Sequence, residues 1–524
     1  MQPRPVTASL ALVAGTLVAL SGTTAHAATT RYEAETSPAI CTGTIDSDWA
    51  GHTGSGFCNG TNATGAHAQF TVTAAASGTA TLKVRFANGT TAARPASLTV
   101  NGSAATSVSF ESTGTWGTWA TKTLTVPVTA GSNTIRFSPT NAGGLPNIDH
   151  LDVETGDTTP PPSSSALYVA PGGTDSAAGT QAAPTTLTSA ITRITPGGTI
   201  YLRGGTYRPS QTITIPAGNN GTTSARTKLS AYPGETPVLD FSAQSEDTAN
   251  RGLAVNGSYW HVSGIVVERA GDNGIFVGGS NNVFERTVTR YNRDTGLQLS
   301  RMLSSTPKEQ WPSNNLVLGA ESHDNADSDG EDADGFAAKL TSGPGNVFRY
   351  AVAHNNIDDG WDLYTKSDTG AIGPVTIEDS LALDNGTLSN GGQAGNGDRN
   401  GYKLGGEDIG VNHVIRRNIA YNNGKHGFTY NRNLGSMTVS DNVSIDNEER
   451  NYSFDAGSSV FRGNTSCRGG SGTNDRIVGN TDSSNQFWSG TNGSRCSSYG
   501  GALRWSFAAD GRLVVTFGGN QVTP

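Results

Sequence analysis

Two different patterns of apolar and polar positions divide the chain. Between residues 80 and 140, apolar and polar residues alternate in the segments ATLKVRFANG, ASLTVNG, TKTLTVPV and NTIRFSPT, with turns rich in Gly and Asn between them. Alternation gives a strand one apolar face, and such frequent turns are typical of an antiparallel β-sandwich. We therefore expect an all-β module in the first part of the chain.

From residue 230 onward, the second pattern is a repeat. A glycine followed by an aromatic or aliphatic residue recurs in NGIFV, TGLQL, DGFAAKL, DGWDLY, NGYKL and HGFTY, and these anchor glycines are Gly274, Gly296, Gly335, Gly360, Gly401 and Gly427. Their spacings are 22, 39, 25, 41 and 26 residues, and Asn-rich phrases such as NNVFERTVTRYN lie between them. This period, with short strands and Asn at recurring bends, is typical of a parallel β-helix; the leucine pattern of a leucine-rich repeat is absent.

The ends of this predicted β-helix need covers, because an open edge strand would recruit other strands. The segment 185–194 has a helical pattern and lies just before the repeats, so we expect a short helix that caps the N-terminal end. We expect residues 466–524 to finish and cap the C-terminal end.

Two segments outside these bodies have compositions of their own. The stretch DTTPPPSSS predicts a Pro/Ser/Thr linker at 157–166. At the N-terminus, Arg4 precedes the apolar run ASLALVAGTLVALSG and the small-residue motif AHA, a pattern typical of a secretory signal peptide at 1–27. These boundaries predict a sandwich module at 28–156, a β-helix domain at 167–524 and a secreted, extracellular protein.

Charge and hydropathy restrict the partners. The formal charge is −9 and 15% of residues are charged, without the basic face that a nucleic-acid binder needs. No run after the first 27 residues approaches the roughly 20 apolar residues of a membrane-spanning helix. We expect no nucleic acid and no membrane as partner, and an anionic ligand would need a bridging cation or a local basic patch.

Four cysteines follow the predicted signal peptide, and secretion permits disulfides. We expect the two local pairs, Cys41 with Cys58 and Cys467 with Cys496. Free or differently paired thiols are the alternative.

Alternation along each repeat strand sends successive side chains to opposite faces. One and three residues after the anchor glycines stand apolar pairs, which we place in the interior: Ile275/Val277, Leu297/Leu299, Phe336/Ala338, Trp361/Leu363, Tyr402/Leu404 and Phe428/Tyr430. The residue two after the glycine then points outward, so Asp362 and Lys403 should be neighbours on adjacent coils, about 4.8 Å apart along the stack. The column before the glycine contains Asp334 and Asp359.

Four carboxylates meet at these columns: Asp334, Asp358, Asp359 and Asp362. Two carboxylates about 5 Å apart repel by about 1 kcal/mol in water and roughly 3 kcal/mol at an effective dielectric constant of about 20. A bound cation therefore explains the cluster better than a solvated acidic turn, which is the alternative, and all-oxygen ligands favour Ca²⁺. The preceding stretch DNADSDGEDADG lacks the closing glutamate and flanking helices of an EF-hand. We expect Asp327, Asp329 and Asp332 to be solvated, and a second ion in this loop is the alternative.

A Ca²⁺ ion beside a lysine suits removal of a proton α to a carboxylate. The metal stabilises the charge that develops, a base removes the C5 proton of a uronate, and the C4 oxygen leaves by β-elimination. Lys403 is our candidate base, and Lys339 and Lys366 are the next candidates. The ordinary lysine pKa of about 10.4 must then be depressed, by Ca²⁺ nearby and cations such as Arg399, with partial burial under substrate adding to the effect. An ion pair with Asp362 is the alternative role of Lys403.

The motifs DGFAAKL, NNIDDGWDLYTK and GDRNGYKLGG, in this order after YVAPGGTDSAAGT and GGTIYLRGGTY, resemble the pectate lyases of polysaccharide lyase family 9 over residues 167–460. The resemblance implies a right-handed parallel β-helix that cleaves polygalacturonate to 4,5-unsaturated oligogalacturonides. The site residues that it implies are Asp334, Asp358, Asp359 and Asp362 for a catalytic Ca²⁺ and Lys403 as Brønsted base. The family commonly has phenylalanine where this chain has Tyr402, an interior position at which we expect little consequence.

The first module resembles carbohydrate-binding module family 35 over residues 31–154, through YEAE, GSGF, VRFANG, RPASLTVNG, WGTW and NIDHLDV. The resemblance implies a jelly-roll β-sandwich that binds sugars, often uronic acids. The residues that it implies are Glu33, Glu35 and Asp149 for a structural Ca²⁺, and Trp116, Asn147 and Arg94 for a sugar site. Of two neighbouring tryptophans, we expect Trp119 in the core and Trp116 more exposed.

We therefore expect a secreted, monomeric pectate lyase whose partner is polygalacturonate, pectin or a related plant cell-wall polysaccharide. A β-helix hydrolase is the nearest enzymatic alternative, and it would use paired carboxylates as acid and base without calcium. The sequence is also compatible with a lyase for another uronic-acid polymer and with a non-catalytic β-helical adhesin.

Overall fold

The computed structural model describes residues 29–74, 78–129, 131–155, 164–393 and 395–522. The chain divides into two compact units, Met1–Pro160 and Pro161–Pro524. The predicted signal peptide (1–27) and residues 157–163 of the predicted linker lie outside the described residues. Strand β12 begins at Ser164, so the last three residues of the predicted linker belong to a strand. Within the described ranges, no helix is long and apolar enough to cross a membrane.

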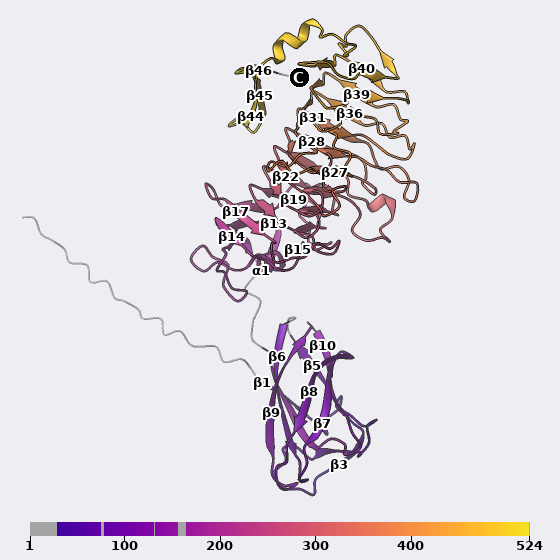
Figure 1. Ribbon diagram of the computed structural model, residues 1–524. Helices are drawn as coiled ribbons and strands as arrows, with labels where there is room; N and C mark the ends of the chain where they lie inside the picture. The colour runs from indigo at the N-terminus through magenta and orange to yellow at the C-terminus, as the bar shows by residue number, and fades with distance from the viewer. Residues whose placement is uncertain (1–28, 75–77, 130, 156–163, 394, 523–524) are drawn as a thin grey trace, which may run out of the picture. The chain divides into compact units, whose positions relative to one another are not determined.

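The first unit is an antiparallel β-sandwich (Figure 1), which confirms the predicted all-β module. One sheet contains β1 (Thr29–Glu33), β3 (Gly43–Asp46), β4 (Phe57–Gly60), β6 (Gly78–Ala87), β9 (Ala120–Val128) and β11 (Asn147–Thr155). The other contains β2 (Ile40–Cys41), β5 (Ala68–Ala74), β7 (Arg94–Val100), β8 (Ser103–Phe110) and β10 (Gly131–Pro139). Alternate residues such as Leu82, Val84, Phe70 and Val72 are buried between the two sheets.

The second unit is a parallel β-helix (Figure 1), as predicted, in which successive coils add one strand to each of three sheets. The first sheet contains β12 (Ser164–Val169), β13 (Ile194–Leu202), β16 (Thr227–Ala231), β19 (Trp260–Ser263), β22 (Val283–Glu285), β25 (Leu316–Leu318), β28 (Asn346–Arg349), β31 (Val375–Glu378), β34 (Val414–Arg416), β37 (Thr438–Ser440), β40 (Val460–Arg462) and β43 (Asn480–Thr481).

The other two sheets follow the same order. The second sheet contains β14 (Gly205–Tyr207), β17 (Pro237–Asp240), β20 (Val266–Glu268), β23 (Val288–Arg290), β26 (Glu321–His323), β29 (Val352–His354), β32 (Leu381–Leu383), β35 (Ile419–Tyr421), β38 (Val443–Ile445) and β41 (Thr465–Cys467). The third sheet contains β15 (Ile213–Ile215), β18 (Leu253–Val255), β21 (Ile275–Val277), β24 (Leu297–Leu299), β27 (Phe336–Ala338), β30 (Trp361–Asp362), β33 (Tyr402–Lys403), β36 (His426–Thr429), β39 (Arg450–Phe454) and β42 (Arg476–Ile477). A short 3₁₀ helix, η1 (Lys308–Gln310), lies in the turn between β24 and β25.

The interior column of the third sheet contains a stack of aromatic rings. Phe336, Trp361, Tyr402, Phe428 and Tyr452 follow one another with ring centroids 5.0, 4.8, 4.6 and 5.1 Å apart, and all are fully buried. Stacked aromatic pairs add stability beyond the area that they bury. The first four rings directly follow anchor glycines, so the predicted interior column is confirmed.

Asparagine side chains form a ladder at the bends that precede the third sheet. The amide of Asn325 donates to Oδ1 of Asn356 (2.8 Å), Asn356 donates to Asn385 (2.9 Å), Asn385 to Asn423 (2.9 Å) and Asn423 to Asn447 (2.8 Å). All five side chains are buried. Since a buried amide needs partners for its donors and its acceptor, one asparagine per coil satisfies the next, which accounts for the Asn-rich phrases.

Helix α1 (Leu187–Arg193) confirms the helix predicted at 185–194. Thr186 caps its N-terminus by accepting the backbone N–H of Ser189 at 3.2 Å. Leu187, Ala190 and Ile191 are buried among interior residues of the first coils, so the helix covers this end of the β-helix.

The C-terminal residues occupy two places. Phe487 packs on Tyr452 and Phe461 at the last coil, with centroids 5.2 and 6.0 Å apart, as a cap would. Strands β44 (Leu503–Phe507), β45 (Leu513–Phe517) and β46 (Asn520–Val522) form a separate antiparallel sheet, the C-terminal hairpin sheet, which packs on the outer face of the second sheet. The prediction that all of 466–524 caps the end is therefore wrong for 503–522.

The described cysteines form two disulfides, Cys41 with Cys58 and Cys467 with Cys496, which are the pairs expected from the sequence. The first joins β2 to β4 in the sandwich. The second joins β41 to η2 (Ser494–Tyr499), near the last coil of the β-helix.

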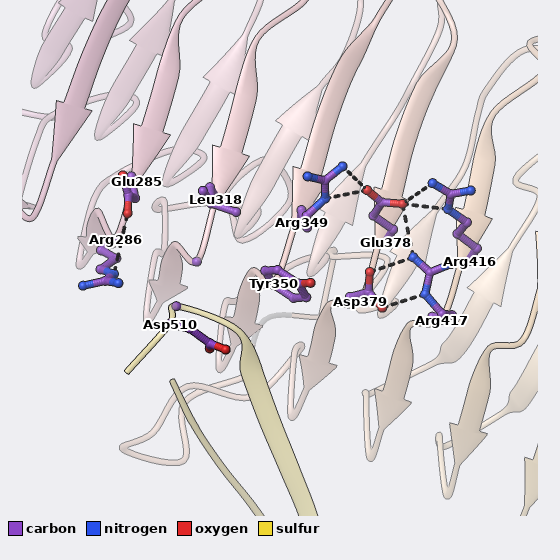
Figure 2. Close-up of a pocket in the computed structure, with 12 residues that line it drawn as sticks. Glu285, Arg286, Leu318, Arg349, Tyr350, Glu378, Asp379, Arg416, Arg417 and Asp510 are labelled. Atoms are coloured by element: carbon purple, nitrogen blue, oxygen red, sulfur yellow. Dashed lines mark hydrogen bonds and ion pairs between the residues drawn. The ribbon is translucent and has the colours of Figure 1, made fainter. Parts of the chain in front are cut away.

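A cavity of about 470 Å³ lies where the turn after β44 meets the first sheet (Figure 2). The buried carboxylate of Glu378 accepts hydrogen bonds from Arg349 and Arg416, both at 2.6 Å. Arg417 donates to Asp379 at 2.7 Å. Because these arginines and acids pair with one another, this cavity is a weaker candidate for catalysis than the third sheet.

Candidate active site

The candidate active site lies at β27, β30 and β33 of the third sheet. The strand register places Ala337 opposite Asp362 and Asp362 opposite Lys403, which confirms the predicted neighbours. Gly360 is needed because adjacent coils approach closely here. A Cβ atom at this position would lie 2.6 Å from the carbonyl oxygen of Gly401, so any other residue would push the two coils apart.

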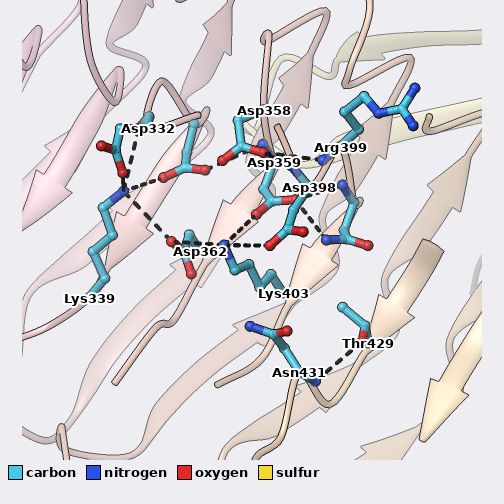
Figure 3. A network of polar contacts seen from close by, with 12 residues as sticks. Asp332, Lys339, Asp358, Asp359, Asp362, Asp398, Arg399, Lys403, Thr429 and Asn431 are labelled. Carbon is cyan, nitrogen blue, oxygen red and sulfur yellow. Dashed lines mark hydrogen bonds and ion pairs between the residues drawn. The ribbon is translucent and has the colours of Figure 1, made fainter. Parts of the chain in front are cut away.

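The predicted acids lie around this column, and Figure 3 labels three of them, Asp358, Asp359 and Asp362. Carboxylate oxygens of Asp334, Asp358 and Asp359 lie within 4.8 Å of one another, and all three side chains are buried. Asp362 is outside this close group, and its Oδ2 lies 3.6 and 3.7 Å from the amino groups of two lysines. The structure thus brings three predicted ligands together and places the fourth beside the lysines.

Two buried lysines lie among these acids. The Nζ of Lys403 lies 3.0 Å from Asp398 and 3.3 Å from Asp359. The Nζ of Lys339 donates to Asp334 at 2.7 Å. Both roles predicted for Lys403, base and ion-pair partner, are therefore compatible with its position.

Loops from the two longer coils cover the site. Asn396 donates to the carbonyl oxygen of Asp329 at 3.0 Å, which joins the loop after β32 to the acidic loop before β27. Asp358 accepts the backbone N–H of Arg399 at 3.2 Å. Lys403 points outward from the sheet, as predicted, but only 8% of it is exposed. The site is recessed rather than on the open surface.

Burial raises the pKa of the Asp334 and Asp358 carboxyls well above their usual range, and repulsion from neighbouring acids adds to it. Burial likewise raises the pKa of Asp359 to about 6. Asp359 Oδ2 and Asp362 Oδ1 are buried and accept no hydrogen bond from the described residues. Buried acids that repel one another fit a cation that takes oxygen ligands, the class to which Ca²⁺ belongs.

The pKa of Lys403 differs in direction from the prediction. Burial opposes the charge on its amino group, but attraction to Asp362 and Asp359 outweighs burial and raises the pKa well above its usual value. Arg399 does not reverse this, because its guanidinium lies 3.7 Å from Glu448. The predicted depression of this pKa is therefore not a property of the residues themselves and would require that a cation neutralise the acids.

Sequence reasoning missed Asp398 and Tyr364. Asp398 pairs with Lys403, and the ring of Tyr364 lies 5.3 Å from the same amino group. The position of Asp398 in GDRNGYKLGG, five residues before the lysine, was the available signal. Of the other candidate bases, Lys339 belongs to the site, whereas Lys366 is exposed in a turn.

The acidic loop keeps most of its charge in solvent. Asp329 and Asp332 are exposed, as predicted. Asp327 is only partly exposed and accepts the backbone N–H of Asp332 at 3.1 Å. Burial raises the pKa of Asp327 to about 6, so the prediction of a solvated side chain is wrong for this residue.

In the sandwich module, Glu33 and Asp149 meet His150 rather than Glu35. Ligand atoms of these three residues lie within 4.8 Å of one another. A bulge between Ile148 and His150 interrupts strict alternation on β11, so both Asp149 and His150 reach this point. Glu35 is not one of these three residues, but it lies close to Glu33, since a Cβ atom at Gly54 would be 1.9 Å from Oε1 of Glu35 and 3.4 Å from Cδ of Glu33. Its Oε2 is buried without a hydrogen bond from the described residues.

Two of the three predicted sugar-site residues contact each other. The guanidinium of Arg94 lies 5.1 Å from the ring centroid of Trp116. The ring of Trp116 lies against Gly89, where a Cβ atom would be 2.5 Å from it. Asn147 is buried at the start of β11 and pairs with Ala87, two residues before that glycine.

The prediction that Trp119 lies in the core is wrong. Both Trp116 and Trp119 are partly buried. Trp119 packs edge-on against Phe57, with centroids 5.3 Å apart, and its Nε1 donates to the carbonyl oxygen of Ala50 at 3.1 Å. An indole keeps a polar N–H, which this half-buried position satisfies.

Fold and site together define a parallel β-helix protein with a recessed cluster of acids and lysines on one sheet. A family model described as "Pel9A-like, right handed beta helix region" matches residues 167–465. The chain belongs to this Pel9A-like family of right-handed β-helix proteins.

Individual relatives agree with this family. "Pectate lyase L" of Paenibacillus polymyxa (strain SC2) is 55% identical over 324 residues, which cover 62% of this chain and 72% of that protein. The solved "Crystal structure of pectate lyase Pel9A" has a TM-score of 0.55 and 34% sequence identity, and the match covers 64% of this chain and 82% of that one.

The sandwich module has relatives of its own. A family model described as "Alpha-galactosidase, CBM13 domain" matches residues 67–153. "Exo-beta-D-glucosaminidase" of Amycolatopsis orientalis is 46% identical over 121 residues, which cover 23% of this chain and 12% of that protein. The module is therefore similar to carbohydrate-binding modules, and the assignment to family 35 stays a prediction.

Proposed function

We propose that this pectate lyase cleaves polygalacturonate by Ca²⁺-assisted β-elimination and releases 4,5-unsaturated oligogalacturonides. One observation supports the proposal most directly: Lys403 lies opposite Asp362, next to three buried acids whose oxygens lie within 4.8 Å of one another. Relatives that share this domain carry the name pectate lyase. A β-helix hydrolase would use two carboxylates as acid and base, and its reaction gives no proton transfer to a lysine.

Asp334, Asp358 and Asp359 would hold the Ca²⁺, with Asp362 beside them. Bound there, the ion would supply positive charge for the substrate carboxylate and for the negative charge that develops on it during the reaction. Asp362 also keeps the amino group of Lys403 at the edge of the cluster, 3.7 Å away.

Lys403 acts as the base. Its Nζ takes the proton from C5 of the uronate, and the electron pair of that C–H bond forms the double bond between C4 and C5. The bond from C4 to the glycosidic oxygen then breaks, and the leaving oxygen takes a proton from water. Because the amino group must be neutral to accept a proton, activity should rise with pH as Lys403 loses its own proton.

The sandwich module, in this proposal, is of family 35 and binds uronic acids of the same polymer. The ring of Trp116 offers a stacking face, the guanidinium of Arg94 beside it attracts a carboxylate, and Asn147 lies nearby. Glu33 and Asp149 would hold a structural Ca²⁺. A secreted monomer with segment 1–27 as signal peptide would act on plant cell-wall polysaccharide outside the cell.

The lyase proposal is tested by incubating the full chain with polygalacturonate and following the ultraviolet absorbance of unsaturated uronate. We expect absorbance that a chelator removes and CaCl₂ restores. Lys403→Ala should abolish it, whereas Lys366→Ala, a matched change at an exposed lysine, should leave it intact. New reducing ends without absorbance would show a hydrolase, and neither signal would show an adhesin.

The same assay tests the assignment of the base. Full activity in Lys403→Ala, with activity lost in Lys339→Ala, would transfer the role of base to Lys339 and leave the lyase reaction standing. Alginate and other uronic-acid polymers, compared with polygalacturonate at equal uronate concentration, test the substrate.

The module is tested separately by Trp116→Ala in the full chain. Retention on insoluble pectin should fall while the initial rate on short soluble oligogalacturonides stays unchanged. Unchanged retention would remove Trp116 from the sugar site.

A further inference from the structure

The second sheet carries another group of possible metal ligands, separate from the column of the candidate active site. Glu321 and His323 on β26 and His354 on β29 offer ligand atoms within 4.8 Å of one another. These side chains point outward, because their neighbours along the strands point inward. Ser322, between Glu321 and His323, and Ala353, which precedes His354, are both fully buried. The proposed reaction uses none of the three ligand residues.

The strand register holds the two imidazoles together. His323 lies directly opposite His354, and their rings stack with centroids 4.8 Å apart and planes 5° apart. Nε2 of His354 lies 3.1 Å from Oε1 of Glu321, and Nε2 of His323 lies 3.9 Å from the same oxygen. One candidate ligand atom from each residue therefore lies in the same small region, and the two rings would have to tilt for both in-plane lone pairs to reach one ion.

Partners on the opposite ring nitrogens orient both histidines. Nδ1 of His354 lies 2.9 Å from Oδ1 of Asn355, which can only accept, so Nδ1 donates there. Nε2 faces Oε1 of Glu321, and a bound metal ion would take the place of a proton on this nitrogen. Nδ1 of His323 lies 2.8 Å from Oδ2 of Asp324, whose other oxygen accepts the N–H of Ser389 at 2.8 Å. A carboxylate or amide behind each imidazole is how proteins orient metal-binding histidines.

The region where these ligand atoms lie is partly shielded from water. The side chains of Glu321, His323 and His354 are 24%, 13% and 18% exposed. The ring of Trp505, on the C-terminal hairpin sheet, lies 5.8 Å from that of His354. The nearby cation Arg290 pairs with Glu268 at 2.7 Å, so its charge is matched elsewhere.

We propose that Glu321, His323 and His354 bind a divalent transition-metal ion of the zinc class, which links β26 to β29 beside the C-terminal hairpin sheet. Imidazole nitrogen and carboxylate oxygen are ligands of Zn²⁺, whereas Ca²⁺ takes oxygen ligands. The two sites of the β-helix therefore select different ions. A hydrogen-bonded pair of His354 and Glu321 without any metal is the competing interpretation.

Calorimetric titration of the full chain with ZnCl₂, in excess CaCl₂, tests the proposal. Wild-type protein should bind one more equivalent of Zn²⁺ than His354→Ala, and His323→Ala should behave like His354→Ala. His261→Ala is the matched control, because His261 has a single carboxylate partner, Glu285 at 2.8 Å, and should keep the extra equivalent. Glu33, Asp149 and His150 of the sandwich module are present in the wild type and in every variant. Any Zn²⁺ that they bind therefore does not change the difference in stoichiometry between these proteins.

Three further measurements separate metal binding from loss of fold. Co²⁺ should give visible absorption bands with the wild type and none with His354→Gln. Retained Ca²⁺-dependent lyase activity of His354→Gln would show that this variant is folded. Asp324→Asn should weaken Zn²⁺ binding by about 10- to 100-fold, because it alters only the partner of His323. Saturating Zn²⁺ should raise the thermal midpoint of the wild type by about 3 °C and leave that of His354→Gln unchanged.

Equal zinc stoichiometry and affinity in the wild type and in His354→Ala would overturn the proposal and leave the hydrogen-bonded pair. Loss of the extra equivalent in His261→Ala as well would also overturn it, since that residue is not part of the group.

Discussion

The second and third sheets of the β-helix have the same backbone spacing but opposite outer faces. On the second sheet, the outward residues Val352, Leu381, Ile419 and Val443 are apolar and pack with Val515 and Phe517 of the C-terminal hairpin sheet. On the third sheet, the outward column continues from Ala337 through Asp362 and Lys403 to Thr429. Both faces are buried, one under a packed sheet and one under loops. The repeat determines which residues face outward, and their chemistry determines what can cover them.

The largest expected effect separates chemistry from stability on the third sheet. Lys403→Gln should lower kcat by about 10²- to 10⁴-fold, the usual contribution of a positioned general base, and change KM little. Thr429→Ala, one coil along the same column and 5% exposed, is the control and should keep wild-type kcat. Initial rates on polygalacturonate in excess CaCl₂ measure both. A kcat of Lys403→Gln within threefold of the wild-type value would remove the functional distinction between the outer faces of the second and third sheets.

The second sheet should show the reverse result. Leu381→Ala should lower the free energy of unfolding by about 3 kcal/mol, because it opens a cavity under the C-terminal hairpin sheet, while kcat per folded molecule stays unchanged. Denaturant unfolding measures the change. If Leu381 packs on Phe517, the double variant Leu381→Ala/Phe517→Ala should lose less free energy of unfolding than the sum of the losses in the two single variants. Additive losses would mean that the hairpin sheet does not pack there in solution.

Acid pH should stabilise the third sheet when a chelator is present. A carboxyl whose pKa is about 6 in the folded protein and about 3.9 unfolded binds its proton more tightly when folded. Asp359 then contributes stability below pH 4 that is lost as pH rises through 6, with a difference of about 3 kcal/mol. Thermal midpoints with chelator should be higher at pH 5 than at pH 8, and CaCl₂ should remove this difference. A midpoint that rises with pH in chelator would contradict the repulsion inferred among these acids.

The smallest effect is expected on the inner side of the third sheet. Tyr402→Phe removes a hydroxyl that donates to the carbonyl oxygen of Ile419 at 3.2 Å, in a fully buried position. We expect a loss of about 1 kcal/mol in stability and unchanged kcat, because the ring stack behind Lys403 is kept. Denaturant midpoints and initial rates check this. A tenfold fall in kcat would show that the hydroxyl helps to position the lysine.

The repeat made the positions of the site predictable. Once the glycines at 335, 360 and 401 were aligned, alternation alone placed Asp362 beside Lys403 and sent Trp361 and Tyr402 inward. These are local consequences of strand geometry, and they do not depend on distant parts of the chain.

Contacts between distant segments were not predictable in the same way. The loops that bury Lys403 and the hairpin sheet that returns to the second sheet depend on tertiary packing. A signal for the hairpin sheet was present, because VAH, LAL, IAY and VSI place apolar residues at outward positions of the second sheet. His150 was missed because the expected ligands of the sandwich module came from a family resemblance, and the β-bulge that brings His150 beside Asp149 has no signal in the sequence pattern.

The unequal spacing of the anchor glycines has a consequence for how such enzymes diversify. Two of the spacings are 39 and 41 residues rather than about 25, and yet the strands on either side remain in register. Because each coil is aligned by its own glycine, interior apolar residue and asparagine, insertions of this size change the walls of the site without displacing its lysine or acids. Substrate preference can therefore evolve through loop length while the reaction chemistry is inherited unchanged.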